Sequence, residues 1–320
     1  GERTNASTTN LLDPVTREWD KELCEKIGIP ASILPPLIDA GEVYGTLSEE
    51  ICERLGCKPV PVIAVGTHDT ASAVVAAPAS EKDFIYISCG TWSLFGTEND
   101  RPVMTQASMD ANFTNEGGYD GTIRFLKNIM GLWLIQESRR QWIREGEQVT
   151  FNQLEQEALA SKPFVSFIDV DHPYFERPGN LPEMVRRYCR ETGQTVPETR
   201  GEVMRCIYQS LAMKYRYTLY NLQALTGKEY HAIHVLGGGI KDTLLCRMTA
   251  DACGIEVLAG PAEATVTGNV AVQLISLGEL DSLWDARKAV RNSTPIQSYA
   301  PENAEEWNVH YHSYLKAIGQ

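Results

Sequence analysis

The chain has 320 residues, of which 43% are hydrophobic and 22% are charged, enough for one large core or two ordinary ones, and two domains are expected. The net charge of −13 disfavours nucleic acid and anionic lipid as partners, because an acidic surface repels both. No apolar run reaches the roughly 18 residues that a transmembrane helix requires. The eight cysteines contain no CxxC pair, which argues against zinc and favours reduced cysteines in a cytoplasmic protein.

In chain order, the first predicted elements alternate between helix and strand. Helical spacing of apolar residues predicts helices over 14–23 and 47–55. The apolar run at 60–66 predicts a buried strand of a mostly parallel sheet. Small residues at 70–77 predict a helix that packs closely against its neighbours. The polar, breaker-rich stretch at 78–83 then marks the expected domain boundary.

The middle of the chain begins with a predicted strand pair, 84–88 and 92–97, joined by a tight Gly90-Thr91 turn. A long helix is predicted to begin near Leu126 and to run to Trp142, because its apolar residues fall on one face. Residues 169–197 are rich in Pro, Asp and Arg, and this composition predicts an irregular insertion.

The last part of the chain alternates strands and helices again. Thr199 and Glu202 form a capping box for a helix that is predicted to run to Leu225. The following elements are predicted as a strand at 231–236, a triple-glycine turn, a helix behind Asp242, a strand at 255–258 and a helix at 265–277. This succession of elements indicates an α/β fold.

Asp69 is the first candidate for chemistry, within Gly66-Thr67-His68-Asp69-Thr70. It follows a predicted strand and precedes a predicted helix, which is where ligands bind in open α/β sheets. A carboxylate in this position can accept a proton from a substrate hydroxyl. Aspartate is also a common residue at helix N-termini, so the local sequence leaves capping and catalysis as equal alternatives.

Two glycine-containing turns are candidates for binding phosphate. The Gly90-Thr91 turn offers backbone N–H groups and a hydroxyl, although it could also be an ordinary hairpin turn. Gly237-Gly238-Gly239 lies between a strand and a helix, where glycine lets a nucleotide approach the backbone and the helix N-terminus favours anions. The alternative for the three glycines is a close-packed strand–helix turn.

Together, the three motifs stand in the order typical of actin-like ATPases and sugar kinases. In detail, the sequence resembles the FGGY family of carbohydrate kinases over essentially all 320 residues. The strings that carry the resemblance are TNASTT from Thr4, GTHDTASAV from Gly66, ISCGTWSLFGTE from Ile87, FLKNIMGLW from Phe125 and the glycine-rich stretch from Gly237 to Asn269.

The resemblance implies an α/β fold of two ribonuclease-H-like domains around a cleft. The first, sugar-binding domain is expected to comprise residues 1–77, with residues 297–320 returning to it. The second, nucleotide-binding domain is expected to comprise residues 78–296. The family's N-terminal strand pair, with its acidic residue and phosphate-binding turn, has no counterpart before Gly1. We therefore expect a first domain truncated at its N-terminus, and little or no kinase activity from these 320 residues alone.

The same resemblance implies roles for individual residues. Asp69 is expected to be the general base that takes the proton of a sugar hydroxyl. His68, Thr70 and Asn128 are expected to contact the sugar. ATP and Mg²⁺ are the expected cofactors, and no side chain is assigned as a metal ligand. The residues expected beside the nucleotide are Gly90, Thr91, Gln136, Gly237, Gly238 and Gly239.

The expected partners are a small ketose sugar and ATP, with no nucleic acid and no membrane, in a monomer or small homo-oligomer. The identity of the sugar stays open within the family. A non-catalytic nucleotide-binding switch of the actin-like superfamily is the alternative from another functional class, and Asp69 argues against it. Related chains can carry a cysteine pair at the region of Cys189 and Cys206, but a reducing cytosol disfavours a disulfide.

Overall fold

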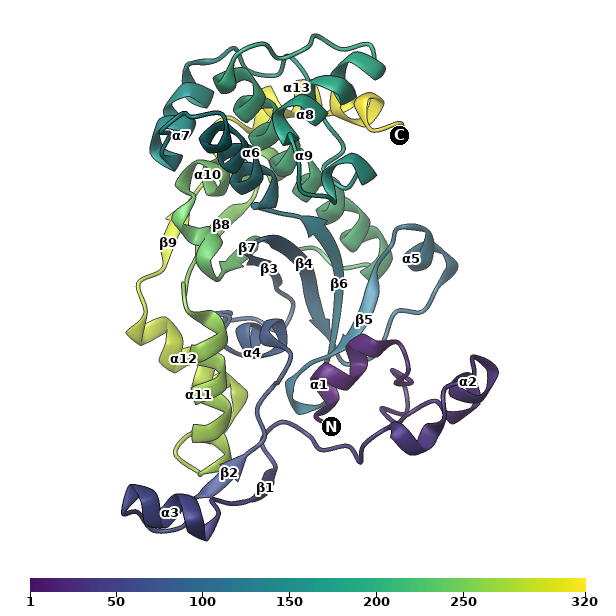
Figure 1. The fold of residues 1–320 in the computed structure, drawn as a ribbon, viewed down its shortest axis with the longest axis vertical. Helices are drawn as coiled ribbons and strands as arrows, with labels where there is room; N and C mark the ends of the chain where they lie inside the picture. Colours follow the sequence, from purple (N-terminus) through teal and green to yellow (C-terminus); the bar gives the residue numbers. More distant parts are fainter. The chain divides into compact units, whose positions relative to one another are not determined.

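The computed structural model describes all residues from Gly1 to Gln320 and divides into two compact units (Figure 1). Unit 1 comprises Gly1–Tyr86, Gly96–Leu126 and Gly260–Ile296, and unit 2 comprises Ile87–Phe95, Lys127–Ala259 and Gln297–Gln320. The α/β class is confirmed. None of the helices has both the length and the apolar character of a membrane span.

Seven strands form the larger sheet, in the order β5-β6-β4-β3-β7-β8-β9. The pair β7–β8 is parallel, whereas β5–β6 and β8–β9 are antiparallel. Strands β3, β4 and β6 each contain residues of both units. The strands are β3 (Ile85–Cys89), β4 (Trp92–Asn99), β5 (Thr114–Gly117), β6 (Ile123–Met130), β7 (Ala232–Leu236), β8 (Glu256–Ala259) and β9 (Gln297–Tyr299).

A long buried helix, α9 (Arg200–Thr226), organises unit 2. The predicted capping box of Thr199 and Glu202 starts it, and Gly227, with φ +67°, ends it in the left-handed conformation. Helices α7 and α10 pack against α9 (Figure 1). The other helices of unit 2 are α6 (Trp133–Arg144), α7 (Phe151–Ala160), η4 (Pro173–Phe175), α8 (Leu181–Glu191), η5 (Gly238–Lys241), α10 (Thr243–Cys253) and α13 (Ala304–Ala317).

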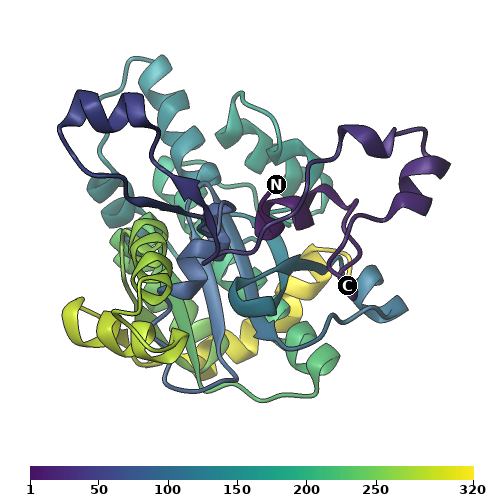
Figure 2. The same ribbon diagram turned by 90° about the horizontal axis from the view of Figure 1, so that it is seen from below.

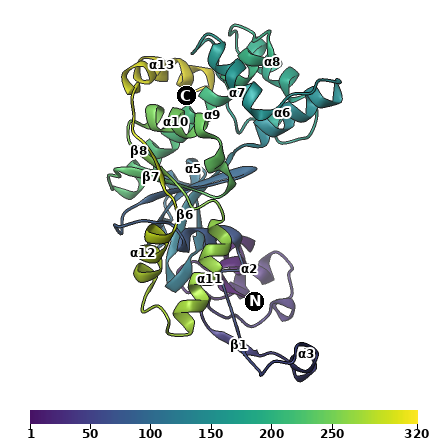
Figure 3. The same ribbon diagram turned by 90° about the vertical axis from the view of Figure 1, so that its left-hand side faces the viewer.

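In unit 1, helix α4 (Asp69–Val75) packs along α11 (Ala264–Ser276) and also contacts α12 (Leu283–Ser293). A two-stranded antiparallel sheet, β1 (Val43–Thr46) with β2 (Pro61–Ile63), projects from this unit together with α3 (Glu49–Leu55) (Figures 1, 2 and 3). The remaining helices are α1 (Arg3–Ala6), η1 (Ser7–Thr9), α2 (Lys21–Lys26), η2 (Ala31–Ile33), α5 (Gln106–Asp110) and η3 (Tyr119–Gly121).

Four predicted elements differ from the structure. Of the helix predicted at 14–23, only residues 21–23 are helical, within α2, because Arg17 takes a positive φ of 60° and the chain reverses between Leu12 and Trp19. The strand predicted at 60–66 is shorter, exposed and antiparallel to β1, where Pro61 lacks an N–H. Residues 126–130 continue strand β6, whose burial on both faces gives an apolar run that resembles a helix face. The predicted irregular insertion at 169–197 contains helix α8.

The boundaries of the two compact units do not coincide with those of the predicted sugar- and nucleotide-binding domains, which stay a prediction. Residues 297–320, expected in the first domain, belong to unit 2, whereas residues 260–296 belong to unit 1. Aromatic contacts account for the first difference, because the rings of Trp307 and Phe164 lie 5.1 Å apart and Tyr188 Oη donates to the carbonyl of Ala317 at 2.8 Å. Residues 260–296 belong to unit 1 because α11 and α12 contribute Ala271, Val272 and Ala286 to one buried apolar cluster with Val75 of α4.

The contact between α4 and α11 depends on Gly268. A Cβ atom at this position would overlap the carbonyl group of Ser72, a backbone group of α4 that cannot rotate away. We therefore expect Gly268→Ala to lower the free energy of unfolding by at least ~1–3 kcal/mol, as overpacking does in other cores. Urea unfolding measures the change. The control is Gly238→Ala, where a Cβ meets no atom within 4 Å, and equal unfolding free energies for the two variants would contradict the prediction.

Candidate active site

The loop that leads to Asp69 is held by the buried carboxylate of Glu2. This carboxylate accepts hydrogen bonds from the backbone N–H of Thr4 and from the N–H and hydroxyl of Thr67, each at 2.9 Å. The hydroxyl of Thr4 in turn accepts the N–H of His68 at 3.3 Å. Glu2 therefore connects the first helix of unit 1 to the segment that precedes Asp69.

Asp69 is the first residue of α4, and its side chain is 81% exposed. The N-cap residue of α4 is His68, so Asp69 does not occupy the capping position that the sequence left as an alternative. Its carboxylate accepts the N–H of Thr70 at 2.6 Å, and its backbone carbonyl accepts the hydroxyl of Thr265 at 3.2 Å. The structure thus presents a fixed carboxylate to solvent at the start of a helix.

His68 and Thr70, the two predicted sugar contacts beside Asp69, differ in exposure. The hydroxyl of Thr70 lies 3.3 Å from the Asp69 carboxylate, and Thr70 as a whole is buried, which leaves little of it to touch a ligand. The His68 side chain is 21% exposed, and its Nδ1 lies 3.2 Å from Nη2 of the buried Arg124. Arg124 also pairs with Glu116 at 3.0 Å.

The charged neighbours determine the protonation of His68. Burial and, next, Arg124 lower the pKa of His68, and the carboxylates of Glu116, Asp69 and Glu2 offset only part of this effect. No sequence motif pointed to Glu2, Glu116 or Arg124 as residues of the site. Only Arg124 carried a signal, and a weak one: it is a charged residue within the largely apolar run that forms strand β6.

Two of the predicted nucleotide-binding glycines, Gly237 and Gly239, lie against Cys89, the residue before the Gly90-Thr91 turn in unit 2. A Cβ atom on Gly239 would overlap the side chain of Cys89, and one on Gly237 would lie 3.2 Å from the Cys89 carbonyl. Gly237 also takes a positive φ of 84°. Gly238 is exposed and has no atom within 4 Å of its would-be Cβ. Gly237 and Gly239 therefore allow close packing against Cys89, which was the alternative interpretation of this turn. Gly238 leaves an open backbone surface.

The Gly90-Thr91 turn is joined to the start of α6, which carries Gln136. The carbonyl of Gly90 accepts the N–H of Leu132, and the carbonyl of Thr91 accepts those of Gly131 and Trp133, all at 3.1 Å. Gln136 lies in the first turn of α6 and is half-buried. The structure thus places Gln136 on the element that anchors the turn.

Asn128 is exposed on strand β6 and not on a helix as predicted. Charged groups hold the end of this strand: the buried Lys214 pairs with Asp169 at 2.9 Å and with Asp171 at 2.8 Å, and Asp171 accepts the N–H of Met130 at 2.9 Å. Burial and the neighbouring Lys214 lower the pKa of Lys127. The sequence reasoning did not find this cluster.

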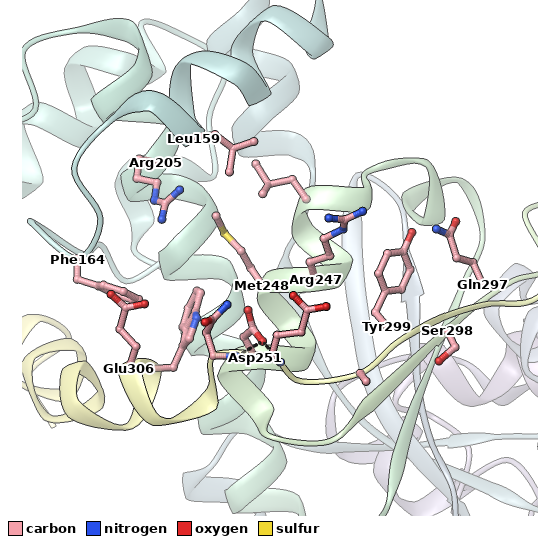
Figure 4. A pocket seen from close by; sticks show the side chains of 15 residues that line it. Leu159, Phe164, Arg205, Arg247, Met248, Asp251, Gln297, Ser298, Tyr299 and Glu306 are labelled. Carbon is pink, nitrogen blue, oxygen red and sulfur yellow. Dashed lines mark hydrogen bonds between the residues drawn. The ribbon is translucent and has the colours of Figure 1, made fainter.

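Cys189 and Cys206 are free thiols that lie beside each other in unit 2, and a hydrogen bond from Cys206 lowers the pKa of Cys189. A separate cavity of about 420 Å³ also lies in unit 2, between α7, α9, α10, α13 and the segment around β9. Figure 4 shows Arg205 and Arg247 extending toward it from α9 and α10. Two arginines and three acidic residues line this cavity, but none of the predicted site residues does.

The α/β fold carries an exposed Asp at the start of α4 in unit 1, and glycine-containing turns follow strands β3 and β7 in unit 2. Comparison with family models defines the class of protein. Residues 85–277 match the C-terminal domain, and residues 1–76 the N-terminal domain, of the FGGY family of carbohydrate kinases. The chain belongs to this family, as its sequence motifs predicted.

The curated relatives are longer than this chain. It is 43% identical over 317 residues to a rhamnulokinase of Bacteroides thetaiotaomicron, covering 99% of this chain and 64% of that protein. It is 41% identical over 304 residues to a rhamnulokinase of Bacillus subtilis, covering 95% of this chain and 62% of that protein. The chain thus spans less than two thirds of the length of either relative.

Solved structures show the same fold at low sequence identity. A ligand-bound xylulose kinase from Lactobacillus acidophilus matches 98% of this chain and 63% of its own, with a TM-score of 0.74 and 15% identity. A glycerol kinase from Plasmodium falciparum with ADP matches 98% of this chain and 62% of its own, with a TM-score of 0.71 and 16% identity.

Proposed function

We propose that this protein is an ATP-dependent rhamnulokinase that phosphorylates the 1-hydroxyl of L-rhamnulose. The exposed carboxylate of Asp69, held at the start of α4, is the observation that supports the chemistry. The identity of 43% to a rhamnulokinase supports the choice of sugar, whereas the xylulose kinase of solved structure is 15% identical.

In the proposed reaction, Asp69 accepts the proton of the sugar's 1-hydroxyl group. The oxygen of that hydroxyl forms a bond to the γ-phosphorus of ATP. The bond between this phosphorus and the β,γ-bridging oxygen breaks, and ADP leaves with the electron pair. The products are L-rhamnulose 1-phosphate, ADP and one proton. Asp69 can take this role because the N–H of Thr70 fixes one of its oxygens while the side chain stays exposed.

The residues of unit 2 fit a nucleotide. The open backbone at Gly238 and the exposed Thr91 offer donors to phosphate oxygens, whereas the N–H of Gly90 already donates to the carbonyl of Trp92 at 2.8 Å. Bound Mg²⁺ would neutralise charge on the transferring phosphoryl group. Magnesium in such sites is held mainly by water and substrate phosphates with one or two carboxylates, so it requires no cluster of protein ligands.

A panel of ketoses tests the proposal. Turnover is measured by coupled ADP detection with L-rhamnulose, L-fuculose and a pentulose, in the longest form of the protein that can be produced. We expect the highest kcat/KM for L-rhamnulose. A preference for L-fuculose or the pentulose would assign the protein to another kinase of the family. Nucleotide binding without turnover of any sugar would instead support the non-catalytic switch.

A further inference from the structure

The contact between His68 and Arg124 determines which nitrogen of the imidazole carries a proton. Nδ1 of His68 lies 3.2 Å from Nη2 of Arg124, within hydrogen-bond distance. A guanidinium has five N–H donors, no acceptor and no accessible neutral form. Nδ1 must therefore accept this hydrogen bond, and the proton of the neutral ring lies on Nε2.

The guanidinium is fixed so that it cannot turn away from His68. Arg124 is fully buried on β6, where its Nε donates to the carbonyl of Gly117 at 2.9 Å. Its Nη2 also lies 3.0 Å from the carboxylate of Glu116 on β5, the strand that pairs with β6. The ring of Tyr86 on β3 is buried beside it. Burial, the Nε hydrogen bond and the ion pair with Glu116 restrict the rotation of the guanidinium, so that Nη2 faces Nδ1.

The charges around His68 also keep the ring neutral. A second proton would have to lie on Nδ1, directly against the Arg124 cation. The groups that face His68 are Arg124, Glu116, Asp69 and Glu2, and with burial their combined effect is to lower its pKa. At neutral pH the ring thus offers one donor, Nε2–H, on a side chain that is 21% exposed.

We propose that Arg124 is a positioning residue that fixes His68 as a neutral hydrogen-bond donor through Nε2. Given the proposed kinase function, the acceptor is an oxygen of the ketose, either its carbonyl or a hydroxyl. A ring with this tautomer cannot take a proton at Nδ1, because the nitrogen's lone pair is occupied by Arg124. This arrangement leaves Asp69 as the group in this loop that accepts the proton of the attacking hydroxyl.

Nuclear magnetic resonance tests the tautomer without any substrate. The chain contains six histidines, so ¹⁵N-histidine labelling gives few signals, and His68→Asn assigns those of His68. We expect an unprotonated, hydrogen-bonded Nδ1 and a protonated Nε2 near neutral pH. A proton on Nδ1, or a His68 pKa at or above that of an exposed histidine, would overturn the proposal.

Variants distinguish the effect of Arg124 on the His68 tautomer from the effect of an unpaired Glu116. Arg124→Met alone would leave the buried Glu116 unpaired, so the test is Arg124→Met with Glu116→Gln, compared with Glu116→Gln as the matched control. We expect the control to keep the single tautomer and the double variant to populate both. Arg124→Lys retains a charged donor, so this variant should keep the single tautomer that the double variant loses. A folded double variant with an unchanged tautomer would show that Arg124 does not set it.

Kinetics distinguish this proposal from the proposed function. In protein that shows turnover, the double variant should raise KM for the ketose about three- to tenfold relative to Glu116→Gln, with KM for ATP unchanged, as expected for one weakened hydrogen bond. An unchanged KM for the ketose would overturn the role of Arg124 in substrate binding. Absence of turnover in the longest form of the protein that can be produced would contradict the kinase function, whereas the resonance result would still decide the tautomer.

Discussion

Replacement of Asp69 by Asn is expected to lower kcat by ~10²–10⁴, the usual effect of removing a general base. Asn retains an oxygen that can accept the N–H of Thr70, so the start of α4 should keep its geometry. Nucleotide affinity should be unchanged, because the substitution removes a proton acceptor and not a phosphate contact. Steady-state kinetics and calorimetric titration with ATP measure the two properties in protein that shows turnover.

The matched control for Asp69→Asn is Asp110→Asn, an equivalent change at an exposed position of α5. This control should retain the kcat of the unmodified protein. A kcat for Asp69→Asn equal to that of the control would remove Asp69 from the mechanism. Loss of ATP binding in Asp69→Asn would point to a structural role for the carboxylate instead.

Replacement of Arg287 by Met is expected to destabilise the protein by ~3–5 kcal/mol, the range measured when one partner of a buried ion pair is removed. Arg287 on α12 is 1% exposed and forms an ion pair with the buried Glu98 on β4. It also donates to the carbonyl of Val74 at 3.2 Å and lies 4.8 Å from the centre of the Phe84 ring. Methionine would leave the Glu98 carboxylate buried and unpaired.

Urea unfolding of three variants checks this expectation. Lys288→Met changes an exposed neighbour on the same helix and should leave the unfolding free energy within about 0.5 kcal/mol of the unmodified protein. Arg287→Met combined with Glu98→Gln should recover much of the loss, because no buried charge remains. If the double variant were as unstable as Arg287→Met, lost packing rather than the unpaired carboxylate would be the cause.

Local signals in the sequence were sufficient for much of the fold. Helix α9 was predicted from the Thr199 capping box, and α10 from Asp242, whose carboxylate accepts the N–H of Leu245 at 2.9 Å. Residues 126–130 of strand β6 were predicted as the start of a helix because both faces of the strand are buried, which removes the alternation that marks a half-buried strand. The grouping of residues 260–296 with the start of the chain depends on contacts such as Gly268 with Ser72, which no local pattern encodes.

In the candidate site, too, residues within local motifs were predicted and residues that act through distant contacts were not. Asp69 and the glycine turns were identified because their residues are contiguous in sequence and their order along the chain is distinctive. Glu2 and Arg124 were not, because each acts on a residue far away: Glu2 on Thr67, 65 positions later, and Arg124 on His68, 56 positions earlier. A charged residue in a single sequence carries no record of the distant group it will pair with.

The β1–β2 sheet of unit 1 has a further consequence for local unfolding. Its two strands pair only with each other and expose apolar side chains such as Tyr44, so this segment is expected to open at a low energetic cost and to exchange its amide hydrogens early. The segment before Asp69 has a support other than β2, because the buried carboxylate of Glu2, near the start of the chain, accepts the N–H and the hydroxyl of Thr67. Fraying of the hairpin can therefore proceed as an independent opening event, while the amide of Thr67 remains protected and the carboxylate of Asp69 keeps its place.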